Sequence, residues 1–222
     1  MEIYPYKTNI HVLTGELFDG DHIDENIDLL QHLISRENDP DEKKKLRSRF
    51  TDIFLVFDMD IQDKRADIIK LEAMLRFFDD PADNGKLYIN YPMLESYRHL
   101  RSLDDEAFKD RCVAVPQLCE YKKIVGMECC NELKDVNRYE KETFRKIIIL
   151  HLKKANFLLN GEFELPSFEE FESWEGADIL RMQHNKIKKD NSVFVLNTSL
   201  FNVVDYRPSD FLIKQETNKG SM

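Results

Sequence analysis

The sequence predicts an α/β protein with a mainly parallel, Rossmann-like sheet and a helical region that is inserted into it or follows it. Three observations lead to this prediction. An unbroken apolar run, Ile53 to Phe57, ends at an aspartate. Strand and helix patterns alternate along residues 1–102, and strand patterns disappear over residues 103–190. Alternating strands and helices are typical of parallel sheets joined by right-handed crossovers.

The first predicted elements are a short strand and a helix. Residues 9–13 (NIHVL) form a short apolar run with β-branched side chains, which predicts a strand. Apolar residues then recur every three or four positions from Ile23 to Ile34, so we expect a helix there. Residues 36–45 are polar around a central proline, which predicts a loop or an exposed helical edge.

The segment from Thr51 to Asp60 (TDIFLVFDMD) is the most informative part of the sequence. Its apolar residues are consecutive and do not alternate with polar ones. A strand that is apolar on both faces needs cover on both faces, as in the centre of a parallel sheet with helices on each side. We therefore expect a central, fully buried strand that ends at Asp58.

Further crossover elements follow this strand. A helix pattern covers residues 68–78, and a turn with a proline and a glycine follows at residues 81–85. Residues 86–91 (KLYINY) predict the next strand, and residues 93–100 begin another helix. This order of elements completes the predicted parallel sheet.

The second half of the chain has mainly helical patterns. One strongly apolar helix covers residues 144–158, and another covers residues 177–189. Ser167 and Glu170 have the spacing of a capping box, which marks a helix start. Residues 193–204 predict a final strand or strand pair that returns to the sheet edge. The predicted organisation is an α/β core, a helical region, returning strands and a polar tail, at residues 1–102, 103–190, 191–208 and 209–222.

The composition is that of a globular protein, with 42% hydrophobic and 33% charged residues. The N-terminal sequence has no basic segment followed by an apolar run, and no apolar stretch approaches the roughly 20 residues that span a membrane. These features predict a cytoplasmic protein with no membrane contact. The sequence carries no signature of an oligomeric state.

A net charge of −10 argues against a broad nucleic-acid-coating surface, because such surfaces neutralise phosphates with lysine and arginine. Two local basic strips remain as candidate nucleic-acid contacts. They comprise Lys43, Lys44, Lys45, Arg47 and Arg49, and Lys186, Lys188 and Lys189. A solvated helix end is the alternative interpretation of either strip.

Four cysteines lie between residues 112 and 130. No C-x2-C pair is present, and the adjacent Cys129 and Cys130 are a poor frame for zinc. We expect ordinary reduced thiols in a helical region.

Asp58 and Asp60 stand where an open parallel sheet binds its ligands, outside the carboxyl end of a strand. Residues two apart on an extended chain point to the same side, so we expect the two carboxylates to converge. Two such carboxylates repel one another unless a cation lies between them. Mg²⁺ (or Mn²⁺) is a hard cation that binds one or two carboxylates and keeps waters for a phosphate substrate. Asp63 is a third candidate metal ligand. A surface acidic pair without a role is the alternative, since the chain has 42 acidic residues.

Glu95 follows the next predicted strand at the same end of the sheet. Adjacent strands lie about 4.8 Å apart, so Glu95 can approach Asp58 and Asp60 if the strands are neighbours. Alternatively, it is an acid in the first turn of a helix, where the macrodipole favours it. His99 lies one turn after Glu95 and is a candidate neighbour of the site, whereas His11 is expected to be a packed core imidazole. The sequence contains no phosphate-binding glycine loop, dinucleotide motif or nucleophile elbow.

Three segments together resemble the Toprim-like nuclease domains of bacterial antiphage and overcoming-lysogeny-type proteins. They read DMDIQ at residues 58–62, NYPMLE at residues 90–95 and VLNTS at residues 195–199. The resemblance spans residues 4–208. It implies a compact Toprim-like α/β fold in which Asp58 and Asp60 coordinate Mg²⁺ during phosphodiester cleavage or transfer.

The resemblance also implies a glutamate at the end of a first strand, in an E-G context, as general acid/base or metal ligand. No E-G dipeptide precedes the D-x-D segment, and Glu16 follows Gly15 in the reverse order. The predicted strand at residues 9–13 is similar to the second strand of the family, so we expect a member that lacks the first strand. Glu95 or Glu16 is then the candidate for the missing catalytic carboxylate.

Three functions are compatible with these features. The first is a Mg²⁺-dependent Toprim-like nuclease, or nuclease remnant, that acts on nucleic acid in phage defence. The second is a catalytically inert module that binds a protein partner through its helical region. The third is a phosphohydrolase that uses Asp58 as nucleophile on small phosphate esters, because an apolar strand followed by D-x-D also begins haloacid-dehalogenase-like phosphatases.

Overall fold

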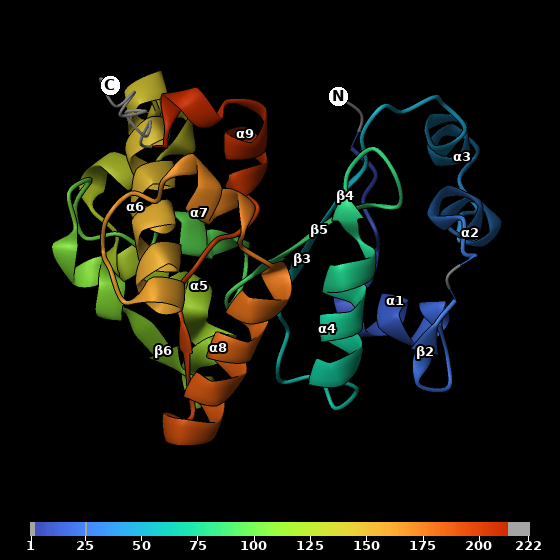
Figure 1. Cartoon of the computed structure of the whole chain (residues 1–222), viewed down its shortest axis with the longest axis horizontal. Coiled ribbons are helices and arrows are strands. Elements are labelled where there is room, and N and C mark those ends of the chain that lie inside the picture. Colours follow the sequence, from blue (N-terminus) through green and yellow to red (C-terminus); the bar gives the residue numbers. More distant parts are fainter. Residues whose placement is uncertain (1–2, 25, 213–222) are drawn as a thin grey trace, which may run out of the picture.

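The structure, a computed structural model, describes residues 3–24 and 26–212 of the chain. Figure 1 shows a smaller half with helices α1 to α4 and a larger half with helices α5 to α9. Strands β3 and β5 run between the two halves. The fold is mixed α/β, and helices predominate over small sheets.

The sheet between the halves contains strands in the order β3-β5-β4. Strand β3 (Phe54–Asp58) and strand β5 (Gly85–Asn90) are parallel, and Asp58 lies opposite Asn90. Strand β4 (Asp79–Asp80) pairs antiparallel with the start of β5. The predicted parallel pairing is thus confirmed for these two strands. Every other strand pair in the described part of the chain is antiparallel, so parallel pairing is limited there to β3 and β5.

Strand β3 lies at the edge of this sheet, so the predicted central position is wrong. Leu55 is buried in the core, whereas Val56 on the other face is 46% exposed. On the same face as Val56, the Phe54 ring lies 6.2 Å from the Tyr88 ring and 6.0 Å from the Tyr206 ring. Aromatic packing therefore shields part of this face, and an unbroken apolar run does not require two fully covered faces.

Residues 9–13 form the start of helix α1 (Ile10–Leu17), so the predicted strand is wrong. The Asn9 side chain caps the helix by accepting a hydrogen bond from a backbone N–H of the first turn at 3.2 Å. Leu13 and Leu17 are four positions apart and both are buried. The apolar run resembles a strand because it ends before this helical spacing becomes visible.

A small hairpin separates α1 from the next helix. It consists of β1 (Phe18–Asp19) and β2 (His22–Ile23). Helix α2 (Leu29–Arg36) begins only after Asp28, whose carboxylate caps it. The helix predicted from Ile23 therefore starts later, because Ile23, the first apolar residue of the helical pattern, belongs to β2.

Aspartate caps also begin the next two helices of this half. Asp39 caps α3 (Pro40–Leu46), which confirms the exposed helical edge among the two predicted options. Asp67 caps α4 (Ile68–Phe77), which confirms the predicted helix. After β5 the chain forms η1 (Leu94–Arg98), a 3₁₀ helix where a regular helix was expected.

The larger half is built mainly from helices, as expected. Helix α6 (Lys141–Asn160) and helix α8 (Gly176–Asp190) confirm the two predicted long helices. Helix α7 (Phe168–Glu172) has the predicted capping box of Ser167 and Glu170. In the described part of the chain, no helix has both the length and the apolar character needed to cross a membrane. The remaining elements are η2 (Glu106–Asp110), η3 (Val115–Glu120), α5 (Tyr121–Glu128), η4 (Asn131–Leu133), η5 (Val136–Arg138), α9 (Phe201–Tyr206) and η6 (Pro208–Asp210).

The helical region also contains a strand, which the sequence did not predict. Strand β6 (Cys112–Ala114) pairs antiparallel with β7 (Ser192–Phe194). The expected returning strand thus joins β6, and the segment after it meets the end of β5 through an isolated bridge between Leu196 and Tyr91. Residues 193–204 therefore provide a short strand and then helix α9. All four cysteines are free, as expected, although Cys112 lies on a strand.

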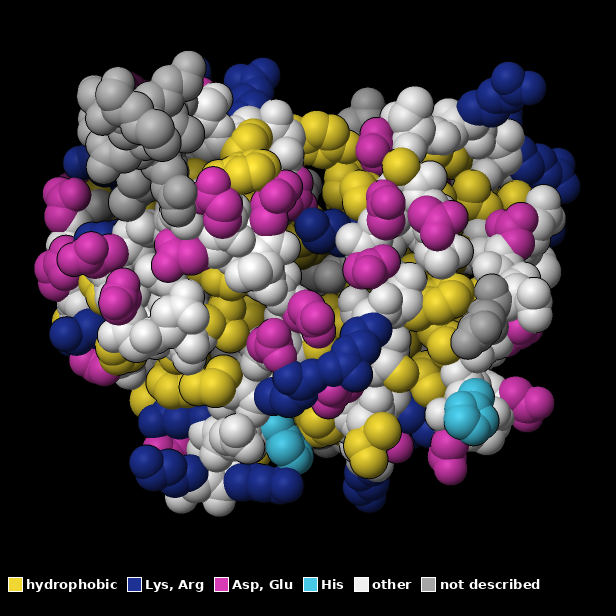
Figure 2. Space-filling view, viewed as in Figure 1, with side chains coloured by type: hydrophobic (Ala, Val, Ile, Leu, Met, Phe, Trp, Pro, Cys, Tyr) yellow, Lys and Arg dark blue, Asp and Glu magenta, His cyan; other side chains and the backbone are white. Residues whose placement is uncertain are grey.

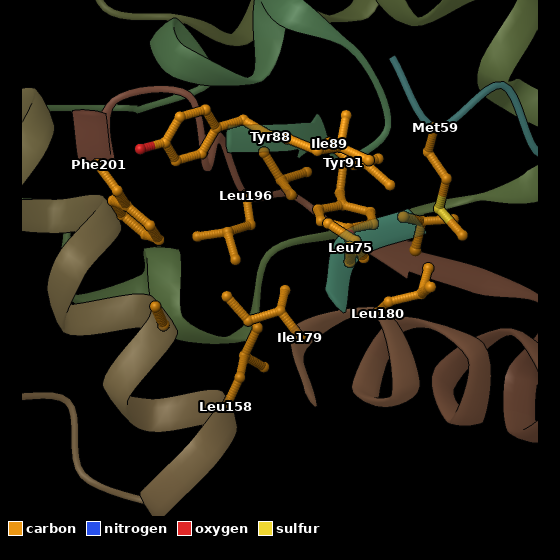
Figure 3. Packing of buried hydrophobic residues seen from close by; sticks show 14 of the residues in the cluster. Met59, Leu75, Tyr88, Ile89, Tyr91, Leu158, Ile179, Leu180, Leu196 and Phe201 are labelled. Atoms are coloured by element: carbon orange, nitrogen blue, oxygen red, sulfur yellow. The ribbon is translucent and has the colours of Figure 1, made fainter. Parts of the chain in front are cut away.

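The two halves share one hydrophobic core. Tyr91 and Leu196 exchange two backbone hydrogen bonds of 2.8 Å each, which connect the end of β5 to the larger half. Figure 3 shows Tyr91, Ile89, Leu75 and Leu196 together in this core. The core therefore fixes the position of the larger half relative to the sheet.

Helices α4 and α8 also contact each other across the boundary between the halves. The Arg181 guanidinium donates to Glu72 at 2.8 Å, and Arg76 contacts the same carboxylate at 3.0 Å. Figure 2 shows dark blue and magenta side chains where these helices meet at the surface. These ion pairs cover the outer side of the apolar junction.

The end of the described chain differs from the predicted polar tail. Phe211 and Leu212 are each only 8% exposed, because these two apolar residues pack on the core. The rest of the predicted tail, residues 213–222, lies outside the described residues.

His151 is a buried polar residue of α6 that holds the segment after β7. Its Nδ1 accepts a hydrogen bond from the Asn197 N–H at 3.1 Å, so its Nε2 carries the proton and donates to the Tyr97 carbonyl at 3.3 Å. Burial lowers the pKa of His151 to about 3 from 6.5. The folded protein therefore holds this imidazole neutral.

We expect the free energy of unfolding to decrease as the pH falls below 6.5 toward 3, since the unfolded chain then binds a proton that folded His151 does not. The contribution of this residue is about 1.4 kcal/mol per pH unit in that window. Urea unfolding should therefore show a shallower pH dependence for His151→Gln than for the wild type. His22→Gln, at an exposed histidine, is the matched control. An unchanged slope in His151→Gln would contradict this assignment.

Candidate functional site

The carboxyl ends of β3 and β5 bring Asp58 and Glu95 to the same place. Asp58 ends β3 opposite Asn90, and the chain then turns so that the Leu94 N–H donates to Asp58 Oδ1 at 2.7 Å. Glu95 is the next residue, and its charge acts directly on the Asp58 carboxyl. Glu95 thus lies on η1, after the strand that neighbours β3, and its charge reaches the Asp58 carboxyl.

The two carboxylates are electrostatically coupled. The pKa of Asp58 is raised, first by partial desolvation among its neighbours. The Leu94 N–H opposes this shift, whereas Glu95 and, more weakly, Asp60 add to it. Lys122 of α5 offsets part of the repulsion, since its Nζ lies 3.0 Å from Glu95 Oε1. The ammonium group of Lys122, whose side chain is largely exposed, therefore already forms an ion pair with one of the two acids.

Asp60 does not continue the direction of Asp58, as the sequence pattern led us to expect. Its backbone is left-handed, with φ of 43°, so the extended spacing of the D-x-D segment ends there. Asn9 Nδ2 donates to Asp60 Oδ2 at 2.9 Å and to Asp63 Oδ2 at 2.7 Å. Arg65 also binds Asp63 and holds the pKa of that carboxyl well below its usual range. Asp60 and Asp63 therefore have protein partners.

His11 supports the turn that carries Asp60. It lies on α1, is 3% exposed, and its Nε2 lies 3.0 Å from the Met59 carbonyl and 3.1 Å from the Asp60 carbonyl. Because both partners are acceptors, Nε2 carries the proton. The buried imidazole was expected, and its helix and its contact with the D-x-D segment were not.

Glu16, the other candidate for the missing carboxylate, belongs to a separate cluster. It accepts a hydrogen bond from Tyr6 at 3.0 Å, lies 3.1 Å from His32 Nε2, and forms an ion pair with Arg36. These partners tie α1 to α2. No contact links Glu16 to Asp58 among the described residues, so the geometry favours Glu95.

The two predicted basic strips do not adjoin the acidic pair. The first lies on and after α3, which Figure 1 places on the side of the smaller half away from the carboxyl ends of the strands. In the second, Lys186 binds Asp190 at 2.7 Å at the end of α8. Lys122, in the first turn of α5, instead contacts Glu95, and together with Lys123 it lines the cavity beside the D-x-D segment.

His99 faces away from the acidic pair. Its Nδ1 lies 3.1 Å from the Tyr121 hydroxyl and its Nε2 lies 3.4 Å from Glu128. Burial lowers the pKa of His99 to about 4. His99 therefore contacts α5 through Tyr121 and Glu128 and is not a direct neighbour of Asp58.

A cavity of about 520 Å³ opens beside the D-x-D segment. Its wall combines the segments that follow β3 and β5 with η3 and α5. The lining includes Asp60, Gln62, Met93, Lys122 and Lys123. This volume falls in the range of small-ligand sites.

The described side chains around Asp58 include few possible ligands for the divalent cation that the sequence suggests. Among the described residues, no three His, Cys, Asp or Glu side chains gather closely enough to hold a metal. Asp58 and Glu95 nevertheless fit the way Mg²⁺ is commonly held, by one or two carboxylates together with waters. Their repulsion, which raises the pKa of Asp58, is the feature that a bound cation relieves.

Comparisons with protein-family models, curated proteins and solved structures gave no match.

Two single substitutions should move the pKa of Asp58 in opposite directions. Glu95→Gln removes a like charge and lowers it, whereas Lys122→Gln removes an opposite charge and raises it. Carbon-detected NMR titration of the Asp58 carboxyl measures both shifts. Glu132→Gln, on η4, is a control for loss of one negative charge elsewhere. Shifts of the same sign in both variants would show that Asp58 does not sense these neighbours.

Proposed function

We propose that the acidic pair Asp58–Glu95 is the centre of a Mg²⁺- or Mn²⁺-dependent, Toprim-like nuclease that hydrolyses phosphodiester bonds in nucleic acid. The observation that carries the proposal is the coupled pair of carboxylates at the carboxyl ends of two adjacent parallel strands. In open sheets with parallel strands, this is the end at which ligands bind.

The chain's own residues have separable tasks in this proposal. Asp58 and Glu95 hold the cation, and the bound cation supplies electrostatic stabilisation of the phosphate and a more acidic water. Lys122 and Lys123 attract the negatively charged backbone of the substrate. Asn9 fixes Asp60, so the loop after β3 keeps its shape while the substrate binds.

The resemblance to Toprim-like domains supports the same chemistry but assigns the third carboxylate differently. Its glutamate belongs to a first strand in an E-G context, and the sequence has no E-G dipeptide before Asp58. Glu95 is adjacent to the residue that hydrogen-bonds Asp58, whereas Glu16 is engaged by His32 and Arg36. We therefore assign the second essential carboxylate to Glu95.

A catalytically inert binding module is the second candidate. The observation that favours it is the outer edge of β3, which has no partner strand among the described residues and exposes Val56. Unpaired strand edges are common sites for the addition of a strand from another chain.

The proposed activity is tested by incubating the purified protein with single- and double-stranded DNA and RNA in Mg²⁺ or Mn²⁺. Asp58→Asn and Glu95→Gln should each reduce cleavage by at least about 100-fold, because each removes a cation ligand. Asp79→Asn is the matched control, since this exposed aspartate lies at the opposite end of the same sheet. Calorimetry should show Mn²⁺ binding that both site variants weaken.

Cleavage that survives unchanged in both site variants would overturn the proposal. Absence of both Mn²⁺ binding and cleavage would favour the binding module. Hydrolysis of p-nitrophenyl phosphate without nucleic-acid cleavage, lost in Asp58→Asn, would instead favour a phosphohydrolase with Asp58 as nucleophile.

A further inference from the structure

A second and larger cavity, of about 830 Å³, lies on the other side of η3 and α5. It shares Cys119 and Glu120 with the smaller cavity beside the D-x-D segment, so the two are neighbours. Its walls come from η2, β6, η3 and α5. The volume is that of a pocket for a small organic ligand.

Arg111 gives this cavity its chemical character. Its Nη1 donates to Asp105 at 2.6 Å and to the His99 carbonyl at 2.8 Å, which fixes the plane of the guanidinium. Phe108 lies under the guanidinium, 5.9 Å from ring centroid to Cζ. Nε and Nη2 have no partner among the described residues, and neither is sealed from solvent. A fixed guanidinium with free donors matches the geometry of a phosphate or carboxylate.

Lys154 lies beside Arg111 in the buried part of this region. Lys154 is fully buried, and its Nζ donates to the Phe108 and Arg111 carbonyls at 2.8 and 2.5 Å. Asp105 is the one carboxylate buried with these two cations among the described residues. Arg111 contributes to lowering the pKa of Lys154, after the larger effect of burial. An anion bound at Arg111 would relieve this repulsion.

The remaining walls are partly apolar. Val113, Pro116, Ile124 and Met127 line the cavity together with the charged residues. On the rim, Glu128 binds Arg101 at 3.0 Å and Glu120 lies 4.0 Å from Lys123, so these acids are partly neutralised. Asp110 also lines the cavity and is exposed.

We propose that this cavity binds a nucleoside phosphate, with the phosphate on Arg111 and the base against Ile124 and Met127. The cavity volume exceeds what a free phosphate ion fills. The apolar wall would also make no favourable contact with such an ion. The site is independent of the acidic pair, from which α5 separates it. Tyr121 of α5 contacts His99, and the next residue, Lys122, contacts Glu95, so a ligand here adjoins the proposed nuclease centre.

The cysteines allow a direct test on the unmodified protein. Cys112 and Cys119 are exposed and line the cavity, whereas Cys129 is buried and Cys130 is half-buried outside it. AMP, ADP, ATP and GTP are added in turn, and alkylation by iodoacetamide is followed at each cysteine by mass spectrometry. At a nucleotide concentration ten times the dissociation constant, alkylation of Cys112 and Cys119 should slow roughly tenfold by mass action. The rate at Cys130 should not change.

Two variants separate binding at Arg111 from general effects. Arg111→Lys keeps the charge but loses the planar fork, so it should abolish the protection. Arg138→Lys makes the same exchange at an exposed arginine of η5 outside the cavity and should keep it. If Arg111→Lys unfolds, as judged by circular dichroism, Met127→Trp serves instead. It narrows the cavity at a residue that is 66% exposed and should likewise abolish protection.

Inorganic phosphate and adenosine complete the test. We expect phosphate or adenosine alone to protect Cys112 and Cys119 from alkylation less than a nucleotide does, because each fills only part of the cavity. Protection by no nucleotide at millimolar concentration would overturn it, as would protection that persists in both Arg111→Lys and Met127→Trp. Because the readout is thiol protection, the result does not depend on nuclease activity.

Discussion

The parallel pairing of β3 with β5 is the constraint on which the rest of the structure depends. Its register places Asp58 opposite Asn90, and the chain that leaves β5 returns across Asp58 through the Leu94 N–H. The same segment carries Tyr91, whose backbone bonds to Leu196 attach the larger half. One strand pair thus positions both the acidic site and the interface between the halves.

Opposing electrostatic effects act on the Asp58 carboxyl, and those that raise its pKa prevail. Desolvation and the neighbouring Glu95 favour the protonated acid, whereas the Leu94 N–H and Lys122 favour the carboxylate. A cation that entered the site would therefore lower the pKa of Asp58. Asp60 adds a weaker like charge, and Asn9 holds its carboxylate in place by donating to Oδ2 at 2.9 Å. The turn at Asp60 therefore tunes the pair as well as ending the strand.

The sequence predicted the features that follow from local pattern. The apolar run before Asp58, the strand before Asn90 and their common carboxyl ends were sufficient to bring Asp58 and Glu95 together. The direction of Asp60 was not predictable, because it depends on Asn9, which is 51 positions away, and on one left-handed residue. Lys122 was missed for a similar reason. Its helix is positioned by packing against η1 and η3, and no local spacing marks that contact.

The central claim is that Asp58 and Glu95 form a single divalent-cation site. Crystals soaked in MnCl₂ and measured near the manganese absorption edge test it most directly. We expect one anomalous difference peak that contacts both carboxylates, with Lys122 displaced from Glu95. A peak held by Asp60 and Asp63 without Asp58, or the absence of any peak at the carboxyl ends of β3 and β5, would contradict it.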